Sequence, residues 1–241
     1  MADARCEVPR ELSQEGKVFG LAGWGRHVIR LVGFDLPMPK DTVEPCVAPS
    51  HYARPLKDRA RAHKSHILLW YAGREESVVE QFVALAALAG VLERFGAVVV
   101  LNETAHTSFP AAALSGKDVK GDMMEQLRTL PLPILYCRFV KYDILNDAHV
   151  CMRTYGAHVL GLPDFAAYAN GHHEGQRYFT MFDSIMRYML NTGKRLAAGY
   201  TMQVGAKDYL RCRAPTRDEP WLESKGEILV VEVIRADQIN R

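Results

Sequence analysis

RTYGAHVLGLPDFAAYANGHHEG, residues 153–175, is the most distinctive local pattern in the chain. It combines a Gly-x-His step, a Gly-Leu-Pro-Asp turn and a polar His-His-Glu end. Its segment Gly156–Leu162 aligns with Gly25–Leu31 through four identities and one aliphatic exchange in seven positions. Glycine and proline specify turns, so we interpret residues 153–165 as a folding signature. Residues 166–175 are not explained by the repeat, and any part of the stretch that meets a partner is expected there.

The order of the expected elements predicts an α+β fold made of two similar ββαβ-like halves. In each half, strand-like stretches precede a buried helix, and another strand follows it. Strands are expected at 18–24, 27–38, 66–72, 97–103, 133–145, 149–156, 199–205, 209–213 and 227–235, and helices at 75–95, 118–130 and 179–196. The dense apolar run at 66–72 is typical of a buried strand. We expect antiparallel or mixed sheets packed against helices.

Three regions follow from this order. Residues 1–16 are expected to be a disordered or polar lead-in, residues 17–130 an N-terminal α+β half, and residues 131–241 a C-terminal α+β half. The halves are expected to pack closely, either as two small domains or as one. Within the second half, residues 214–226 form a long polar loop.

The bulk composition narrows the class of partner. The chain has 241 residues, with 30 basic and 28 acidic side chains and a net charge of +2, so no overall field favours nucleic acid or an anionic membrane. The local basic run at 54–64 is interpreted as a solvated face. The longest apolar-rich segment, 78–92, is shorter than a membrane span, and the N-terminus has no signal-peptide pattern. We expect a cytoplasmic protein that is a monomer or a weak dimer.

The sequence contains no recognisable catalytic or cofactor motif. The glycines that precede Arg26 lack the order of the dinucleotide fingerprint, and neither a phosphate-loop Gly-Lys-Ser/Thr nor a Gly-x-Ser-x-Gly elbow occurs. His172-His173-Glu174 is the most suggestive metal pattern, but its glycine-flanked position indicates an exposed turn. His63 and His66 do not share a helix face. We expect no catalytic residue, no cofactor and no metal.

Two polar segments are the best candidates for contact with a protein partner. The loop around Trp221 also carries Asp218, Glu219 and Glu223, and a large aromatic side chain in a polar loop is typical of an interface anchor. The second segment is His172, His173 and Glu174. For Trp221 an alternative stays open, in which the indole folds back as a lid over the edge of the sheet.

Several turn-forming residues resemble those of an uncharacterised bacterial family, domain of unknown function 4261. In the second half they are Thr154-x-Gly156, Gly161-Leu162-Pro163-Asp164, Tyr188 in a following helix, and Gly199-Tyr200-Thr201. In the first half they are Pro37-Met38-Pro39 and Lys64-Ser65-His66-Ile67. The resemblance covers residues 20–205 and departs from the family pattern at Leu160 and Tyr200. It implies an architecture and no established reaction.

These observations favour a non-enzymatic protein-binding protein. A small α+β protein of this kind is similar in type to bacterial immunity proteins, which bind and neutralise a cognate toxin, including toxins of type VI secretion. We therefore expect an immunity or accessory protein of a toxin system, with that toxin as its partner. The rival hypothesis is an enzyme of unknown chemistry with a site between the two halves, where His27 and His158 occupy equivalent positions of the repeat.

Overall fold

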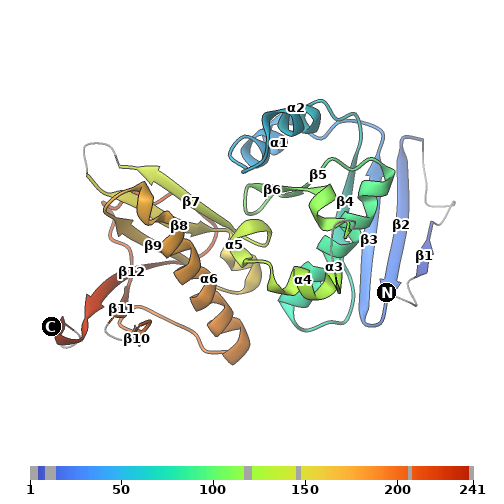
Figure 1. Ribbon diagram of the computed structural model, residues 1–241. Coiled ribbons are helices and arrows are strands. Elements are labelled where there is room, and N and C mark those ends of the chain that lie inside the picture. The colour runs from blue at the N-terminus through green and yellow to red at the C-terminus, as the bar shows by residue number, and fades with distance from the viewer. Residues whose placement is uncertain (1–4, 9–14, 117–120, 145–147, 206–207, 239–241) are drawn as a thin grey trace. The chain divides into compact units, whose positions relative to one another are not determined.

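A computed structural model describes the chain over residues 5–8, 15–116, 121–144, 148–205 and 208–238. The chain divides into two compact units, an N-terminal unit of Met1–Glu103 with Thr107–Leu130 and a C-terminal unit of Thr104–His106 with Pro131–Arg241. Each unit combines helices with its own sheet (Figure 1), which confirms the α+β class. Within the described ranges, no helix is long and apolar enough to cross a membrane.

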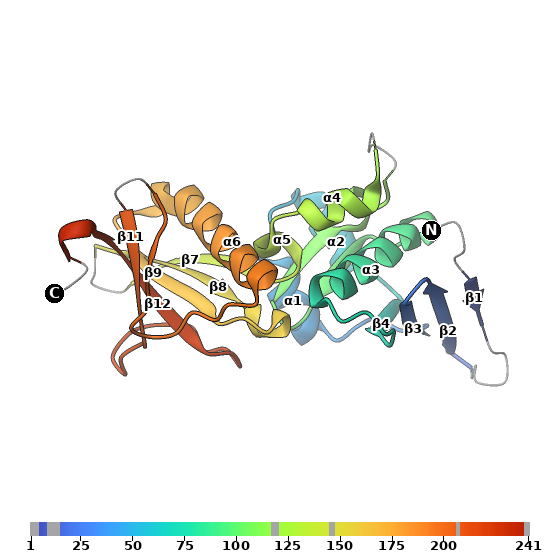
Figure 2. The same cartoon turned by 90° about the horizontal axis from the view of Figure 1, so that it is seen from below.

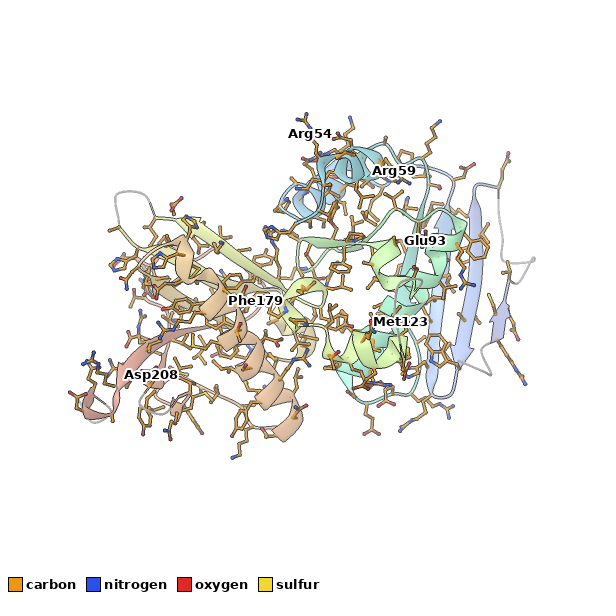
Figure 3. All side chains as sticks on the ribbon, in the orientation of Figure 1. Arg54, Arg59, Glu93, Met123, Phe179 and Asp208 are labelled. Carbon is orange, nitrogen blue, oxygen red and sulfur yellow. The ribbon has the colours of Figure 1, made fainter. Side chains whose placement is uncertain are left out.

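The N-terminal unit is built around a four-stranded antiparallel sheet in the order β1-β2-β3-β4. Its described elements are β1 (Arg5–Glu7), β2 (Lys17–Trp24), β3 (His27–Phe34), α1 (Lys40–Val47), α2 (Arg54–Arg61), β4 (His66–Tyr71), α3 (Val78–Val91), η2 (Leu92–Phe95), β5 (Val99–Asn102), β6 (Thr107–Pro110), η3 (Ala111–Leu114) and α4 (Met123–Thr129). Strands β5 and β6 form a separate two-stranded sheet. The basic α2 carries Arg54 and Arg59 (Figure 3), and its Arg61 pairs with Glu44 of α1 at 2.7 Å.

Helix α3 lies over β3 and β4 on one face of this four-stranded sheet (Figure 2). The Ser77 hydroxyl accepts a hydrogen bond from the Glu80 N–H and so caps the start of the helix. Small buried residues, mostly alanines, let the helix lie close to its neighbours. Gly90 shows how close, because a methyl group there would lie 1.9 Å from the Leu114 carbonyl oxygen of η3. Against α3 the sheet presents Ile29, which is fully buried, and Ala22.

The C-terminal unit is built around a six-stranded mixed sheet in the order β10-β11-β12-β9-β8-β7. Its described elements are α5 (Leu132–Leu135), β7 (Arg138–Asp143), β8 (Val150–Tyr155), η4 (Ala157–Leu160), β9 (Asp164–Ala169), η5 (His172–Glu174), α6 (Gly175–Thr192), β10 (Thr201–Gln203), β11 (Asp208–Arg213), β12 (Ile228–Arg235) and η6 (Ala236–Gln238). Among its strand pairs, β9 and β12 are parallel and the others antiparallel.

Both faces of the six-stranded sheet are covered. On one face, α6 packs through Phe182 against Phe165 of β9 and through Phe179 (Figure 3) against Phe139 of β7. On the other face lies the connection between β11 and β12, residues 214–226, which we call the strap. The strap contacts β7, β8 and β9 through side chains described below.

The structure corrects three expectations from the sequence. The segments aligned as a repeat differ, because Gly25–Leu31 forms a hairpin turn and a strand whereas Gly156–Leu162 forms a 3-10 turn. Part of the expected lead-in, Arg5–Glu7, pairs with β2 as a strand; residues 1–4 and 9–14 lie outside the described residues. The strand expected from residue 133 begins only at Arg138, after the short helix α5.

The expectation of a buried strand at 66–72 is also wrong. β4 is an edge strand of its sheet, and Ile67 and Trp70 are 45% and 48% exposed. Its apolar residues point to both faces, as in a strand covered on both sides. Neither face is fully covered, because Ile67 on the α3 side is nearly as exposed as Trp70 on the other side.

Candidate functional site

The polar residues of the stretch 153–164 form a buried cluster in the C-terminal unit. The Asp164 carboxylate accepts hydrogen bonds from the N–H groups of Ala157 at 3.0 Å and Gly156 at 3.3 Å, and from the Thr154 hydroxyl at 3.3 Å. It also pairs with the Arg153 guanidinium at 3.4 Å, and both charged side chains are 0% exposed. Asp164 thus fixes the start of η4 and neutralises a buried cation, which is a structural role.

Arg153 also joins the sheet to the strap. Its Nη2 donates to the Ser224 hydroxyl at 2.6 Å, and its Nε donates to the Thr154 carbonyl at 3.1 Å. Among the described residues, the buried Arg153 Nη1 and His158 Nδ1 have no hydrogen-bond partner. His158 lies against Gly226, where an added methyl group would come 2.9 Å from the His158 Cβ and 3.3 Å from its ring. The base of the strap is therefore packed tightly on this cluster.

Aromatic contacts hold the middle of the strap. The Tyr142 hydroxyl of β7 donates to the Pro220 carbonyl at 3.0 Å and accepts from the Leu222 N–H at 3.1 Å. The Trp221 ring packs on Tyr168 of β9, with 4.7 Å between ring centroids. Burial and the nearby Glu219 charge raise the pKa of Tyr168 to about 12. Trp221 is thus folded back onto the sheet, as the alternative interpretation of the sequence proposed, but it covers the central strand β9 and not an edge.

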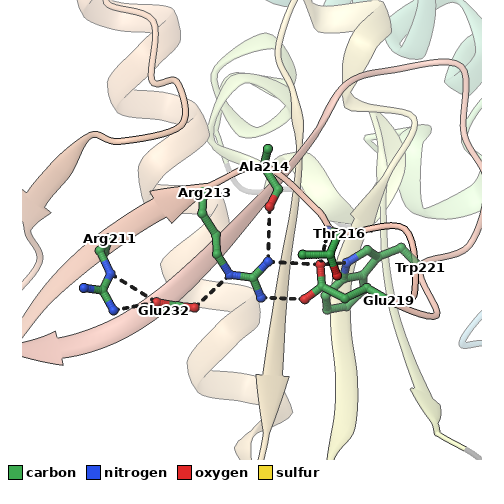
Figure 4. Close-up of polar contacts among 7 residues, drawn as sticks. All are labelled: Arg211, Arg213, Ala214, Thr216, Glu219, Trp221 and Glu232. Atoms are coloured by element: carbon green, nitrogen blue, oxygen red, sulfur yellow. Dashed lines mark hydrogen bonds and ion pairs between the residues drawn. The ribbon is translucent and has the colours of Figure 1, made fainter.

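Glu219 is the electrostatic centre of the strap (Figure 4). Arg213 of β11 donates to both of its carboxylate oxygens, the Thr216 N–H donates at 2.7 Å, and the Trp221 indole donates at 3.2 Å. Burial raises the pKa of the Glu219 carboxyl, but these hydrogen bonds outweigh it and hold that pKa at about 2. The Arg213 Nε also donates a hydrogen bond to the Glu232 carboxylate of β12 at 2.8 Å. Glu219 is therefore committed to contacts within the unit.

The strap residues predicted to contact a partner divide into two groups. Asp218 and Glu223 are exposed, whereas Trp221 and Glu219 are partly buried and engaged in the contacts just described. For Asp218 and Glu223, contact with a partner stays a prediction. In this conformation Trp221 and Glu219 fasten the strap to its sheet.

The His-His-Glu segment forms the short turn η5 before α6. His172 and His173 are exposed, and the His172 ring nitrogen Nε2 lies 2.8 Å from the Asp143 carboxylate. Glu174 is mostly buried; its carboxylate accepts from the Asn170 N–H at 2.6 Å and from Arg177 at 3.3 Å. Across the described parts of the chain, no group of three or more His, Cys, Asp or Glu could hold a metal ion. Contact of these three residues with a partner stays a prediction.

A cleft opens where the parallel strands β9 and β12 separate. Their pairing ends at Ala166 and Val230. Beyond it lies a cavity of about 400 Å³, lined by Tyr168, Asn170, Glu174, Arg177, Tyr178 and Val230–Val233. The carboxyl ends of parallel strands are a common place for ligands. Here Arg177 pairs with Glu174, and Glu232 pairs with Arg211 and Arg213, so the charges of the cleft already serve internal contacts.

The two histidines of the rival enzyme hypothesis pack within their own units. His27 lies against Trp24 and Tyr71 in the N-terminal unit, and its Nδ1 is 3.1 Å from the Tyr71 hydroxyl. His158 packs on the base of the strap in the C-terminal unit. Among the described residues, no hydrogen bond joins a carboxylate to either ring. The Glu75 carboxyl lies near His27, and its pKa is lowered by the Ser77 N–H and, to a smaller extent, by the charge of that ring. The enzyme hypothesis stays a prediction.

The N-terminal sheet has an open face, which sequence reasoning missed. Opposite α3, strands β2, β3 and β4 present a set of side chains that we call the outer face: Lys17, Phe19, Leu21, Val28, Arg30, Val32, Phe34, His66, Leu68 and Trp70. Every one of them is exposed or half-buried. Leu21, Val28 and Trp70 are 38%, 37% and 48% exposed. Exposed apolar side chains gathered on one face of a sheet are typical of an interaction site.

The available signal for this face lay in β4. Ile67, Leu69 and Tyr71 point to one side of the strand, and Leu68 and Trp70 to the other. Both alternations are apolar, which indicates a strand covered on both faces. Among the described residues, α3 lies on the side of Leu69 and Tyr71, and Trp70 on the other side is 48% exposed.

Comparison with known proteins gives one result, in the C-terminal unit. Residues 153–231 match the family model described as Domain of unknown function (DUF4261). The resemblance found in the second half of the sequence is thus confirmed, and the first-half motifs at 37–39 and 64–67 lie outside the matched residues. A search of the curated proteins and a search of the solved structures returned no match.

Proposed function

We propose that this protein is a non-enzymatic protein-binding protein that uses the outer face of its N-terminal sheet. The observation that carries the proposal is the exposure of Leu21, Val28 and Trp70 on neighbouring strands of one surface. Apolar side chains gathered on an open sheet face gain free energy when a partner removes them from water, at roughly 25 cal/mol per Å² of buried apolar area. Tryptophan is among the residues that most often dominate such contacts.

Within this class, we propose an immunity or accessory protein that acts in the cytoplasm and neutralises a cognate bacterial toxin. The support is an analogy of type, because small α+β proteins with a dedicated binding surface commonly serve this purpose. A nearly balanced charge of +2 favours a protein over nucleic acid or a membrane as the partner. The C-terminal unit, whose sheet is covered on both faces, then serves as a stable support.

The proposal is tested with the full chain as bait in extracts of the organism that encodes it. Wild type is compared with Trp70→Asp, which places a charge on the outer face, and with Tyr200→Asp as the control. Tyr200 is 54% exposed and lies in the other unit. We expect one stoichiometric protein to be retained by wild type and by the control, and to be lost with Trp70→Asp.

The partner's activity tests the finer statement. The retained protein is expressed alone and together with the chain, and bacterial growth is measured. Toxicity that wild type suppresses and Trp70→Asp does not suppress supports neutralisation of a toxin. A harmless partner leaves the protein-binding function standing and refutes the immunity role. Equal retention of the partner by all three baits refutes the outer face as the binding surface.

A further inference from the structure

The outer face carries a cation in its centre. In the register of the sheet, Leu21 of β2 stands opposite Arg30 of β3, and Arg30 stands opposite Trp70 of β4. Directly opposed side chains on one face lie about 5 Å apart at their Cβ atoms. Arg30 is therefore flanked by Leu21 and Trp70, and the same row ends at Glu7 of β1, one strand beyond Leu21. A partner that covers Leu21 and Trp70 must also cover Arg30.

Arg30 differs from the other arginines that anchor this fold. Arg61 and Arg128 are paired with the carboxylates of Glu44 and Glu80 at 2.7 and 2.8 Å. Arg30 is exposed, and among the described residues no carboxylate lies within ion-pair distance of it. At the end of the same face, the Lys17 ammonium lies over the Phe34 ring, 6.0 Å from its centroid. The outer face thus carries positive charge at Arg30 and Lys17 among apolar side chains.

Covering such a charge sets a condition on the partner. A cation removed from water without a counter-charge weakens binding strongly, whereas a carboxylate opposite it restores affinity and fixes the partner's register. We propose that the partner of the outer face is an apolar protein segment that carries an Asp or Glu, whose carboxylate pairs with Arg30. This inference rests on the proposed protein-binding function and adds the chemistry of the partner to it.

A single-stranded nucleic acid is the other molecule that favours basic and aromatic sheet surfaces. The arrangement of the aromatic rings argues against it here. The Phe34 ring is already stacked on His66, with 4.8 Å between centroids, and Phe19 is half-buried. Trp70 is the one strongly exposed aromatic of the face, and its exposed neighbours Leu21 and Val28 are aliphatic. The face offers little stacking surface for successive bases and a broad contact for apolar side chains.

The inference is tested by selecting peptides that bind the outer face from a random library. Peptides displayed on phage are selected on the full-length wild type and depleted on Trp70→Asp, so that only binders of the outer face remain. The same selection is run on Arg30→Glu, with Arg30→Gln as a second variant in case the charge reversal impairs folding. Circular dichroism and urea unfolding establish that each variant is folded.

We expect wild type to enrich apolar peptides that contain Asp or Glu. Arg30→Gln should abolish the acidic preference, and Arg30→Glu should replace it by Lys or Arg. Synthetic copies of the wild-type peptides should bind Arg30→Gln about tenfold more weakly or worse, as expected when one member of an interfacial charge pair is removed. Replacement of their acidic residue by Gln or Asn should cost wild type a similar factor.

Three results would overturn the inference, and they are distinguishable. Apolar peptides with no charge preference would refute the acidic partner and keep the proposed protein-binding function. No peptide that depends on Trp70 would refute the outer face itself as a binding surface. Binding of a labelled oligothymidylate that is lost in both Trp70→Asp and Arg30→Glu, measured by fluorescence anisotropy, would identify nucleic acid as the occupant instead.

Discussion

The two principal sheets of this protein differ in how their faces are covered. The six-stranded sheet has α6 on one face and the strap on the other, whereas the four-stranded sheet has α3 on one face and an open outer face. Trp221 and Trp70 illustrate the contrast. Trp221 packs on Tyr168 and donates a hydrogen bond to Glu219, and Trp70 stands 48% exposed beside Arg30. The first completes the fold, and the second is exposed on the face that we propose for binding.

The largest effect is expected at the buried cluster of Arg153 and Asp164, on which the strap of the C-terminal sheet is packed. Asp164→Ala leaves the Arg153 cation buried without a counter-charge and removes the acceptor for the N–H groups of Gly156 and Ala157. We expect the free energy of unfolding to fall by about 3–5 kcal/mol. Urea denaturation followed by circular dichroism measures it.

A matched control separates this effect from the loss of any surface carboxylate. Asp218 is exposed in the strap, so Asp218→Ala should change the free energy of unfolding by no more than about 0.5 kcal/mol. If Asp164→Ala cost as little as Asp218→Ala, the cluster would have no structural importance and the coverage of this sheet would need another explanation.

The next prediction concerns helix α3, which packs on β3 and β4 of the N-terminal sheet. Gly90→Ala in α3 would place a methyl group 1.9 Å from the Leu114 carbonyl oxygen, so the helix must shift away from η3. We expect a loss of about 1–3 kcal/mol in the free energy of unfolding. Helix propensity alone would change it in the opposite direction, by about 1 kcal/mol. Stabilisation by Gly90→Ala would therefore contradict the close approach of α3 and η3.

The third prediction compares the two tryptophans directly. Trp221→Ala removes the ring contact with Tyr168 and should lower the free energy of unfolding by about 1–2 kcal/mol. Trp70→Ala removes an exposed ring and should change it by no more than about 0.5 kcal/mol. Partner binding should reverse this order, with the larger loss for Trp70→Ala. Equal stability losses would mean that the outer face is covered by the chain in solution.

Much of the fold could be predicted from local sequence patterns. Where the predictions were wrong, contacts between residues far apart in the sequence are the cause. Hydrophobic periodicity and turn residues predicted the β2–β3 hairpin and helix α3 correctly. The repeat misled because Gly156–Leu162 is bent into a 3-10 turn by Asp164, and the aligned position in the first half is Gly33, which has no carboxylate. Likewise Leu132, at the start of α5, donates its N–H to Asp183 of α6, a partner 51 residues away.

The candidate site was harder to predict because exposure depends on which face another element covers. In β4 the side chains on both sides of the strand are apolar. The same pattern is expected for a strand buried on both sides and for a strand with one side exposed for a partner. Trp221 was singled out because its neighbours in the sequence are polar, yet the folded chain supplies Tyr168 and Glu219 around it. Trp70 was assigned to the core because its neighbours in the sequence are apolar, yet its side of the sheet is open.

The smallest expected effect is a pH dependence of the strap. The pKa of Glu219 is about 2 in the folded state, against an ordinary value of 4.5. Above pH 4.5 the carboxylate is ionised whether or not the strap is docked, so its stabilising contribution is complete. As the pH falls from 4.5 towards 2, the undocked state takes up the proton first, and the contribution declines until it is lost below 2. We expect the free energy of docking to change by about 1 kcal/mol, because a pair this near the surface is screened by solvent.

The measurement uses the protein with 5-fluorotryptophan incorporated. ¹⁹F NMR should show the Trp221 resonance shifting between pH 4.5 and 2 while that of Trp70 stays fixed. Glu219→Gln should abolish the shift and Asp218→Asn should preserve it. A Trp221 resonance that followed the same pH profile in Glu219→Gln would show that another group holds the strap on its sheet.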